Sequence, residues 1–398
     1  MQKKNGKLIF SPSDLTKFLS SEFVTWMDRF SLEFPGNAQR DEDSETNKIL
    51  QQKGLDHERA FLESLQQQGR DVFDVSSAPD RYLATANAMK DGREIIFQGA
   101  LSDDEFIGYA DFLVRTPGDS SLGSYHYEPW DTKLALRAKP YFLVQLACYA
   151  DLLCSIQETL PRHVHVVLGD KQLKTFRTED YFYYYRELRR ALLAQQQEWD
   201  RNDPPDFIGS EDFGRWTGYA ERLMEQQDHL CRVANIRGVQ IKKLSRAGIT
   251  TMCQLAQSKL SSVPRMQSSS FAALKQQARL QIESKGLDIP KFEVISPQPY
   301  GQGLATLPPA SPLDVYFDME GYPLIEGGLE YLFGATILDN GSPEFVDWWA
   351  YDQKQEKQAF ERFVDWVYDR WQRDPLMHVY HYAAYEKTAL RRLMGKYA

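Results

Sequence analysis

Two aspartates and a lysine form the pattern in this chain that is best suited to chemistry. Asp111 lies in the apolar segment 108–114, which a loop rich in Gly and Ser is expected to follow. Asp131 and Lys133 lie near the end of a second strand-like segment, 125–134. Residues two apart on a strand leave the same face, about 6.5–7 Å apart along it. Carboxylates suit a hard divalent cation, and an ammonium stabilises the charge that develops on a phosphate. The pattern predicts a Mg²⁺ or Mn²⁺ site at Asp111 and Asp131, with Lys133 beside the attacked group.

The segment after this pattern has the spacing of a helix that could carry substrate-binding side chains. Pro140 suits a first helical turn, and apolar residues recur at helical spacing through residue 154. Gln145 and Tyr149 are four apart, so both can reach one point, such as a nucleotide or a metal-bound water.

An Asp and a Lys two apart on a strand, such as Asp131 and Lys133, more often form a solvated face. Their apolar neighbours favour chemistry here.

A histidine precedes these segments in another helical pattern. Leu50, Gly54, His57 and Phe61 fall on one face of the expected helix. A histidine on such a face is more often a satisfied core residue. The alternative is that His57 supplies a third metal ligand.

Taken together and in this order, these residues resemble a nuclease family. The matching positions are His57, Asp111, Asp131-x-Lys133 and Gln145-x-x-x-Tyr149. The order is similar to that of the RecB-like branch of the PD-(D/E)XK nuclease superfamily, over about residues 7–210. The resemblance implies an α/β fold, a restriction-endonuclease-like mixed sheet flanked by helices.

The resemblance also assigns roles and partners. It implies that His57 and the two aspartates bind the metal and that Lys133 supports the nucleophile. Gln145 and Tyr149 would contact the substrate. It implies exonuclease action on DNA ends in repair or recombination, beside a helicase. The residues themselves do not separate DNA from RNA.

The cysteines depart from the pattern of many of these relatives, which hold an iron–sulfur cluster. Ser20 and Ser21 stand where an early cysteine would be expected. None of the four cysteines forms a C-x-x-C pair; they are Cys148, Cys154, Cys231 and Cys253. We therefore predict no cluster and no zinc site. Few, scattered cysteines favour reduced thiols and a cytoplasmic location.

The whole chain sets the class of protein. Its 398 residues predict two to three domains, and 42% apolar residues suffice for real cores. The first residues do not form a signal peptide, and no apolar run reaches the ~18 residues of a membrane span. We expect a soluble protein with no membrane partner.

Charge is distributed unevenly along the chain. The net charge is −9, but residues 229–282 contain nine basic residues and no Asp or Glu, so the rest carries −18. A local basic segment is typical of a phosphate-binding surface. Its short helices and glycine turns resemble a helix-hairpin-helix module, although the second glycine of the hairpin would fall at Gln240. The predicted backbone contacts are Arg237, Lys242, Lys243 and Arg246. The alternative is a solvated basic linker.

Composition predicts four segments. They are a nuclease domain at 1–210, a basic helical module at 211–290, a linker rich in Pro and Gly at 291–312, and a last domain at 313–398. The last domain predicts three strands, a helix over about 355–371 with Val364 on its inner side, a strand at 376–382 and a second helix. This is the order of an RNase H-like fold. Its strand-like segment 313–320 carries Asp318 and Glu320 on one face.

This Asp-x-Glu resembles the first motif of the DEDD exonucleases, which hold two metal ions. The resemblance places the next acidic ligand at Glu386, where the family usually has Asp. The final acidic motif and fifth strand would follow Ala398, the last residue. We therefore expect this second site to be incomplete in this chain.

Two enzyme classes are excluded by the motifs that they require. The sequence has no G-x-x-x-x-G-K-[ST] loop and no G-x-S-x-G elbow, so neither an ATPase motor nor an α/β-hydrolase is encoded. The sequence predicts a metal-dependent DNA nuclease. The alternatives are a non-catalytic nucleic-acid adaptor and a 3′–5′ exonuclease that acts through Asp318 and Glu320.

Overall fold

The computed structural model describes residues 1–294, 303–323, 325 and 327–397. Contacts divide the chain into two compact units, residues 1–292 and 293–398. Of the predicted linker 291–312, residues 295–302 lie outside the described residues. The finer division of the first unit at residue 210 stays a prediction. No helix of the described part is both long and apolar enough to cross a membrane.

A mixed six-stranded sheet forms the centre of the first unit, as the resemblance implied. Its order is β3-β4-β5-β6-β7-β8, with antiparallel β4–β5, β5–β6 and β7–β8 pairs and parallel β3–β4 and β6–β7 pairs. The strands are β3 (Val72–Asp74), β4 (Ile95–Ser102), β5 (Ile107–Ser120), β6 (Gly123–Thr132), β7 (His163–Val167) and β8 (Leu173–Arg177).

The hairpin of β5 and β6 is longer than the sequence predicted. The Gly- and Ser-rich stretch after Val114 was expected to be a loop, and that prediction was wrong. β5 continues to Ser120, and pairing with β6 extends to Ser120 and Gly123 across an irregularity. Polar residues alternate with the pleat there, so they belong to strand edges rather than to a loop.

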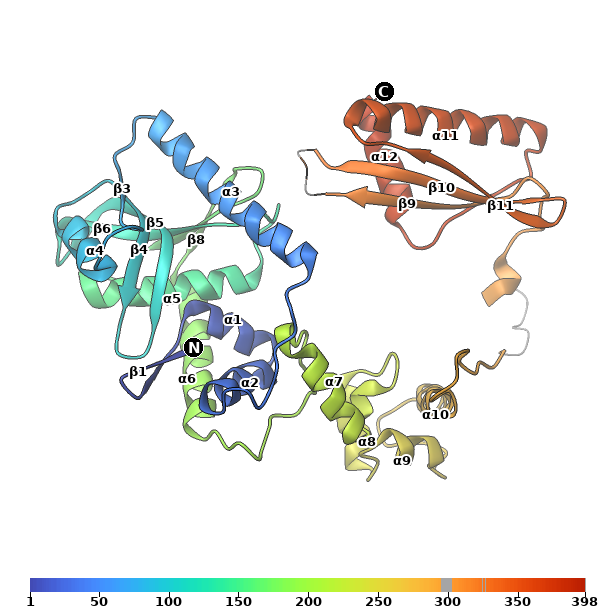
Figure 1. Ribbon diagram of the computed structural model, residues 1–398, viewed down its shortest axis with the longest axis horizontal. Coiled ribbons are helices and arrows are strands. Elements are labelled where there is room, and N and C mark those ends of the chain that lie inside the picture. Colours follow the sequence, from blue (N-terminus) through green and yellow to red (C-terminus); the bar gives the residue numbers. More distant parts are fainter. Residues whose placement is uncertain (295–302, 324, 326, 398) are drawn as a thin grey trace. The chain divides into compact units, whose positions relative to one another are not determined.

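Helices cover both faces of this sheet (Figure 1). One face packs on α1 (Pro12–Ser20), α4 (Arg81–Lys90), α5 (Pro140–Gln157) and α6 (Glu179–Gln197). The other face packs on α3 (Glu45–Gln67), whose Phe61, Leu62 and Leu65 contact Phe97 and Phe112 of the sheet and their neighbours. Successive strand residues point to opposite faces, so Ile96 and Leu113 join the first core while Ile95 and Val114 join the second.

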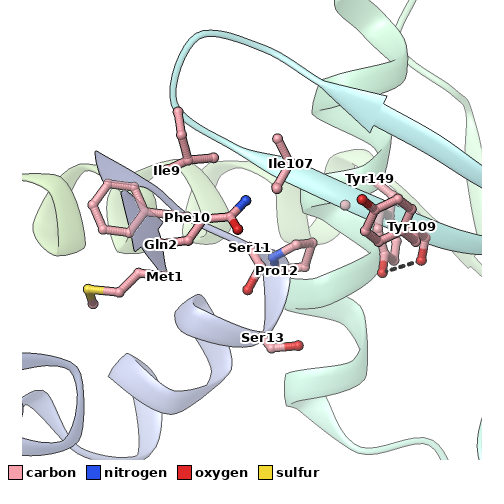
Figure 2. Close-up of a pocket in the computed structure, with 11 residues that line it drawn as sticks. Met1, Gln2, Ile9, Phe10, Ser11, Pro12, Ser13, Ile107, Tyr109 and Tyr149 are labelled. Atoms are coloured by element: carbon pink, nitrogen blue, oxygen red, sulfur yellow. Dashed lines mark hydrogen bonds between the residues drawn. The ribbon is translucent and has the colours of Figure 1, made fainter. Parts of the chain in front are cut away.

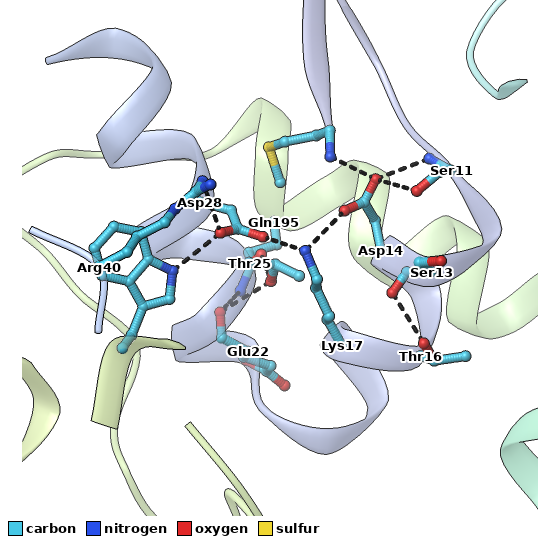
Figure 3. Close-up of polar contacts among 12 residues, drawn as sticks. Ser11, Ser13, Asp14, Thr16, Lys17, Glu22, Thr25, Asp28, Arg40 and Gln195 are labelled. Atoms are coloured by element: carbon cyan, nitrogen blue, oxygen red, sulfur yellow. Dashed lines mark hydrogen bonds and ion pairs between the residues drawn. The ribbon is translucent and has the colours of Figure 1, made fainter. Parts of the chain in front are cut away.

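The N-terminal segment forms a small two-stranded sheet and two helices that anchor the helical region. The sheet is β1 (Gln2–Lys4) with β2 (Lys7–Ile9), and α2 (Glu22–Glu33) follows α1. Trp216, in the short 3₁₀ helix Gly214–Trp216, is buried against α2. Its Nε1 donates to Asp28, which Lys17 also contacts at 2.8 Å (Figure 3). Burial alone would raise the pKa of Asp28, but Lys17, Trp216 and Arg40 together lower it.

The helical region that follows has its own core. It contains α7 (Thr217–Gln226), the 3₁₀ helix Leu230–Arg232, α8 (Gly238–Arg246), α9 (Met252–Gln257) and α10 (Ser268–Glu283). Leu230, Ile241, Leu244, Leu255 and Phe271 are buried together there. Four elements thus close around one small apolar cluster.

The second unit has the element order that the sequence predicted. A short 3₁₀ helix, Gly303–Thr306, precedes a sheet of order β11-β10-β9-β12, in which β12 runs parallel to β9 and the other pairs are antiparallel. The elements are β9 (Val315–Tyr322), β10 (Leu329–Asp339), β11 (Ser342–Trp349), α11 (Gln353–Arg373), β12 (Val379–Tyr380) and α12 (Tyr385–Tyr397). Both helices contact the sheet.

Two details of this unit differ from the prediction. Val364 was expected on the inner side of α11, but it is 44% exposed, while Phe363 beside it is buried. The strand predicted at residues 376–382 is only Val379–Tyr380. The exposure of Val364 follows from helix geometry: an α-helix rotates by about 100° per residue, so two neighbouring residues cannot both face the centre of the core.

Candidate active site

The β5–β6 hairpin brings Asp111 and Asp131 to the same place. The antiparallel register pairs Phe112 with Trp130, so Asp111 and Asp131 stand opposite each other one residue further along. Residues opposite each other in such a pair project from the same face. Asp131 also pairs with Val166 of β7 in parallel. The two carboxylates therefore lie near the end of β6, where its pairing with β5 stops and its pairing with β7 continues.

Lys133 forms an ion pair with Asp131, with which it was predicted to share a strand face. Its Nζ lies 2.5 Å from Asp131 Oδ2, and its backbone N–H donates to Val167 O at 2.8 Å. Burial raises the pKa of Asp131 to about 7; the charge of Lys133 opposes this shift and that of Asp111 adds to it. Burial alone would lower the pKa of Lys133, but Asp131 and Asp111 outweigh it and raise that pKa. The ammonium therefore stays charged.

Asp111 is held by the backbone and side chain of one residue. Its Oδ2 accepts from Thr132 N at 2.8 Å and from Thr132 Oγ1 at 2.7 Å. Burial, and after it the charge of Glu58, raise the pKa of Asp111. Lys133 and Thr132 lower it, and the net result is a pKa of about 6. Near pH 7 and without a cation, Asp131 is therefore about half protonated, while Asp111 is mostly ionised.

The sequence prediction missed the third carboxylate, Glu58 on α3. Burial raises the pKa of Glu58, and the charge of Asp131 adds to the shift, so its carboxylate faces the same pair. Its Oε1 accepts from Gln98 Nε2. His57, the predicted third ligand, is its neighbour in sequence, and the buried His57 Nε2 has no hydrogen-bond partner among the residues that the structure describes. The sequence offered one signal for this carboxylate: Glu58 is the acidic residue directly after His57.

Gln98 holds an unusual backbone conformation beside this cluster. It has φ of 56°, the left-handed region that few residues other than glycine adopt. The β4–β5 register places it opposite Asp111, since Phe97 pairs with Phe112 and Gly99 pairs with Ala110. Arg81 Nη2 donates to Gln98 O at 2.7 Å. This bond fixes the conformation that lets the Gln98 side chain reach α3.

Gln145 and Tyr149 lie together on α5, as their spacing predicted. Gln145 Nε2 donates to Tyr149 Oη at 3.3 Å. Tyr149 Oη in turn donates to Tyr109 O at 2.8 Å (Figure 2). Burial raises the pKa of Tyr149 well above its usual value, and the charges of Asp131 and Asp111 raise it further. Tyr149 is therefore a neutral hydrogen-bond donor that lies near the carboxylate pair.

The donor set fits a divalent cation in its chemistry. Asp111 and Asp131 supply oxygen ligands, and burial raises the pKa values of both, a shift that a bound cation would oppose. His57 Nε2 adds a buried nitrogen that has no hydrogen-bond partner in the described part of the chain. Among the described residues, however, no group of three or more His, Cys, Asp or Glu side chains is arranged to hold a metal ion. The structure thus brings together the charge that a cation needs but not a finished coordination shell.

The second predicted site lies on the exposed side of β9. Asp318 and Glu320 are exposed and alternate with buried Phe317 and Met319, so they share a face as predicted. Glu386, in the first turn of α12, is 4% exposed, and its Oε2 lies 3.2 Å from His381 Nδ1. The structure pairs Glu386 with a histidine rather than with the two carboxylates.

The basic module presents only part of the predicted contact set. Arg237, Lys242 and Arg246 are exposed, and the last two are one helical turn apart on α8. Lys243 Nζ instead donates to the carbonyl of Arg265, which ties α8 to the segment between α9 and α10. Gln240, where the hairpin's second glycine would fall, lies inside α8 and accepts from Arg237 N at 2.8 Å.

One comparison with known proteins names part of the chain. Residues 315–398 match the family model of the RNase H superfamily. The matched residues contain β9 to β12, α11 and α12, so the order predicted for this fold is confirmed. The match does not extend into residues 1–292. No curated protein matches the chain. An RNase H-superfamily domain suggests a role related to nucleic acids.

Proposed function

We propose that the protein is a metal-dependent nuclease that hydrolyses phosphodiester bonds of DNA at the Asp111–Asp131–Lys133 cluster. The observation that carries the proposal is a pair of carboxyl groups with raised pKa values, of which buried Asp131 lies 2.5 Å from the charged ammonium of Lys133. Such a cluster is costly for stability, and strongly shifted pKa values of this kind gather at functional sites.

Asp111 and Asp131 would hold Mg²⁺ or Mn²⁺. Glu58 and His57 would have to move closer to add further ligands, since no such group of three is preformed among the described residues. The ion would lower the pKa of a water and neutralise charge on the phosphate. Lys133 would stabilise the negative charge that develops on the phosphate oxygens, because it stays protonated in this cluster. Gln145 and Tyr149 would orient the substrate strand through their hydrogen-bonded pair.

End-labelled single- and double-stranded DNA with Mn²⁺ tests the proposal. We expect cleavage by the unaltered protein, no cleavage by Asp131→Asn, and a rate about 10²–10³-fold lower in Lys133→Met. Asp104→Asn and Lys139→Met are matched controls, because both side chains are exposed in the same unit, and neither should change the rate. DNA binding should survive all four substitutions.

The same experiment separates the alternatives. A non-catalytic adaptor would bind DNA with and without EDTA and cleave nothing. A second nuclease site on β9 is favoured by the RNase H-superfamily match and by the shared face of Asp318 and Glu320. Cleavage that is lost in Asp318→Asn and kept in Asp131→Asn would select that site and reject the first one.

A further inference from the structure

A pocket of about 450 Å³ lies beside the candidate active site, and the proposed mechanism does not use it (Figure 2). One wall is the chain from Ile9 to Ser13, and the other is the beginning of β5 at residues 107–109. Tyr149 of α5 also lines it. The volume lies within the range of about 300–1,000 Å³ that is typical of small-molecule sites.

Backbone hydrogen bonds fix the two walls against each other. Phe10 N donates to Glu105 O at 2.9 Å, and Ile107 N donates to Phe10 O at 2.9 Å. Pro12, which also lines the pocket, is buried at the start of α1. The walls therefore belong to the folded frame of the domain and need no rearrangement to form a site.

Two tyrosines connect the pocket to the carboxylates. Tyr109 lines the pocket and lies two residues before Asp111 on β5. Tyr149 lines it as well and donates to the carbonyl of Tyr109 at 2.8 Å. A group in the pocket therefore lies next to the place where a phosphodiester would be cleaved.

The lining of the pocket selects a neutral planar ligand. None of the described residues that line it is Asp, Glu, Lys, Arg or His. Apolar side chains such as Ile9 and Ile107 are combined with the polar groups of Gln2 and Ser13. The charged group among these lining residues, the N-terminal ammonium of Met1, is already paired with Asp14 at 2.7 Å. A heteroaromatic ring has apolar faces and polar edges that match both kinds of wall.

Tyr109 has the properties of a stacking surface. Its side chain is 40% exposed, and the guanidinium of Arg81 lies 4.1 Å from the centre of its ring. Tyr82 Oη lies 3.5 Å from Tyr109 Oη. The ring is thus supported by its neighbours while much of it stays accessible, and a base stacked on such a ring gains affinity with little sequence preference.

Building on the proposed nuclease function, we propose that this pocket binds one unpaired nucleobase of the substrate strand, next to the phosphodiester at the Asp111–Asp131 pair. A base can enter only when it is unpaired and unstacked. The substrate class is therefore single-stranded DNA or a frayed end, and not the interior of a duplex.

Binding of short single strands in EDTA tests the pocket without cleavage. A set of strands carries one abasic nucleotide at successive positions, and fluorescence anisotropy gives each Kd. We expect one position at which loss of the base weakens binding about tenfold, the size of one stacked base. Tyr109→Ala should bind every strand of the set about equally, because the stacking surface is gone. Tyr109→Phe should keep the difference.

Two further variants separate the pocket from general damage. Ser13→Trp should fill the pocket and remove the same positional difference, because Ser13 is exposed at its wall and its hydroxyl makes no hydrogen bond in the described part of the chain. Tyr183→Ala removes a tyrosine that is 77% exposed on α6, outside the pocket, and should change nothing. Thermal unfolding confirms that each variant folds.

The outcomes separate this inference from the proposed nuclease. A Kd that is the same for every abasic position, or no binding of single strands at all, overturns the pocket. Equal losses in Tyr109→Ala and Tyr183→Ala also overturn it. Cleavage of DNA in Mn²⁺ without a positional difference would leave the nuclease and reject the pocket. A positional difference without any cleavage would keep the pocket and reject the nuclease.

Discussion

The affinity of the cluster for a divalent cation should fall steeply as the pH falls below 8. Metal binding requires both carboxyl groups to be ionised, and burial raises the pKa of Asp131 to about 7 and that of Asp111 to about 6. These values belong to the interacting pair rather than to either residue alone. Acid therefore competes with the metal over a range in which ordinary carboxylates are already ionised.

The magnitude follows from the two values. The share of protein with both groups ionised falls from about nine-tenths at pH 8 to about one-twentieth at pH 6. The Kd for Mn²⁺ should therefore rise about 20-fold over this range. Binding at pH 7 should release about 0.6 proton.

Isothermal titration calorimetry with Mn²⁺ measures both quantities, since titrations in buffers of different ionisation enthalpy count the released protons. Asp104→Asn should show the same pH dependence as the unaltered protein. The reasoning is refuted if the Kd changes less than about threefold between pH 8 and pH 6, because a carboxyl pair with raised pKa values cannot bind so evenly.

Three further outcomes are expected. In EDTA the raised pKa of Asp131 stabilises the folded state while the carboxyl group is protonated, so the free energy of unfolding should fall by about 1.5 kcal/mol from pH 6 to pH 8, and Asp131→Asn should remove most of this fall in denaturant titrations. The double substitution Lys242→Ala and Arg246→Ala should reduce the slope of log Kd against log salt by about 1.5 for DNA. Lys396→Met leaves fully buried Glu356 without its cation at 2.7 Å and should lower thermal stability by about 2 kcal/mol.

The last two of these outcomes each have a control variant. Lys90→Ala removes an exposed lysine on α4 and should leave the salt slope unchanged. Lys357→Met breaks an exposed pair with Glu361 on α11 and should cost less than about 0.5 kcal/mol. Stability that rises with pH in EDTA, or an unchanged salt slope in the double variant, would contradict the corresponding assignments.

Much of the frame was predictable because periodicity records burial. The helix from Pro140 and the strands around Asp111 and Asp131 follow from apolar spacing, and the structure has all of them. The shared face of Asp131 and Lys133 follows from the pleat alone. The order of elements after residue 313 needed no more than alternation and helical spacing, and the RNase H-superfamily match agrees with it.

The rest of the cluster depends on contacts that no local pattern records. Glu58 reaches the carboxylates only because α3 packs across the sheet, and a helix carries no mark of which strand it will cover. The left-handed conformation of Gln98 arises from its bond with Arg81 and from its place opposite Asp111. Lys243 looked like a phosphate ligand, but its partner is a carbonyl 22 residues away in sequence.

The β5–β6 register also limits where residues can be inserted into this hairpin or deleted from it. Removal of one residue between Phe112 and Ser120 would turn Asp111 to the opposite side of the sheet, because side chains alternate at every step. The tip of the hairpin is formed by Ser121 and Leu122. Residues inserted there would not change the alignment of the two aspartates. Length variation in related sequences should therefore concentrate at the tip and be absent from the strands below it.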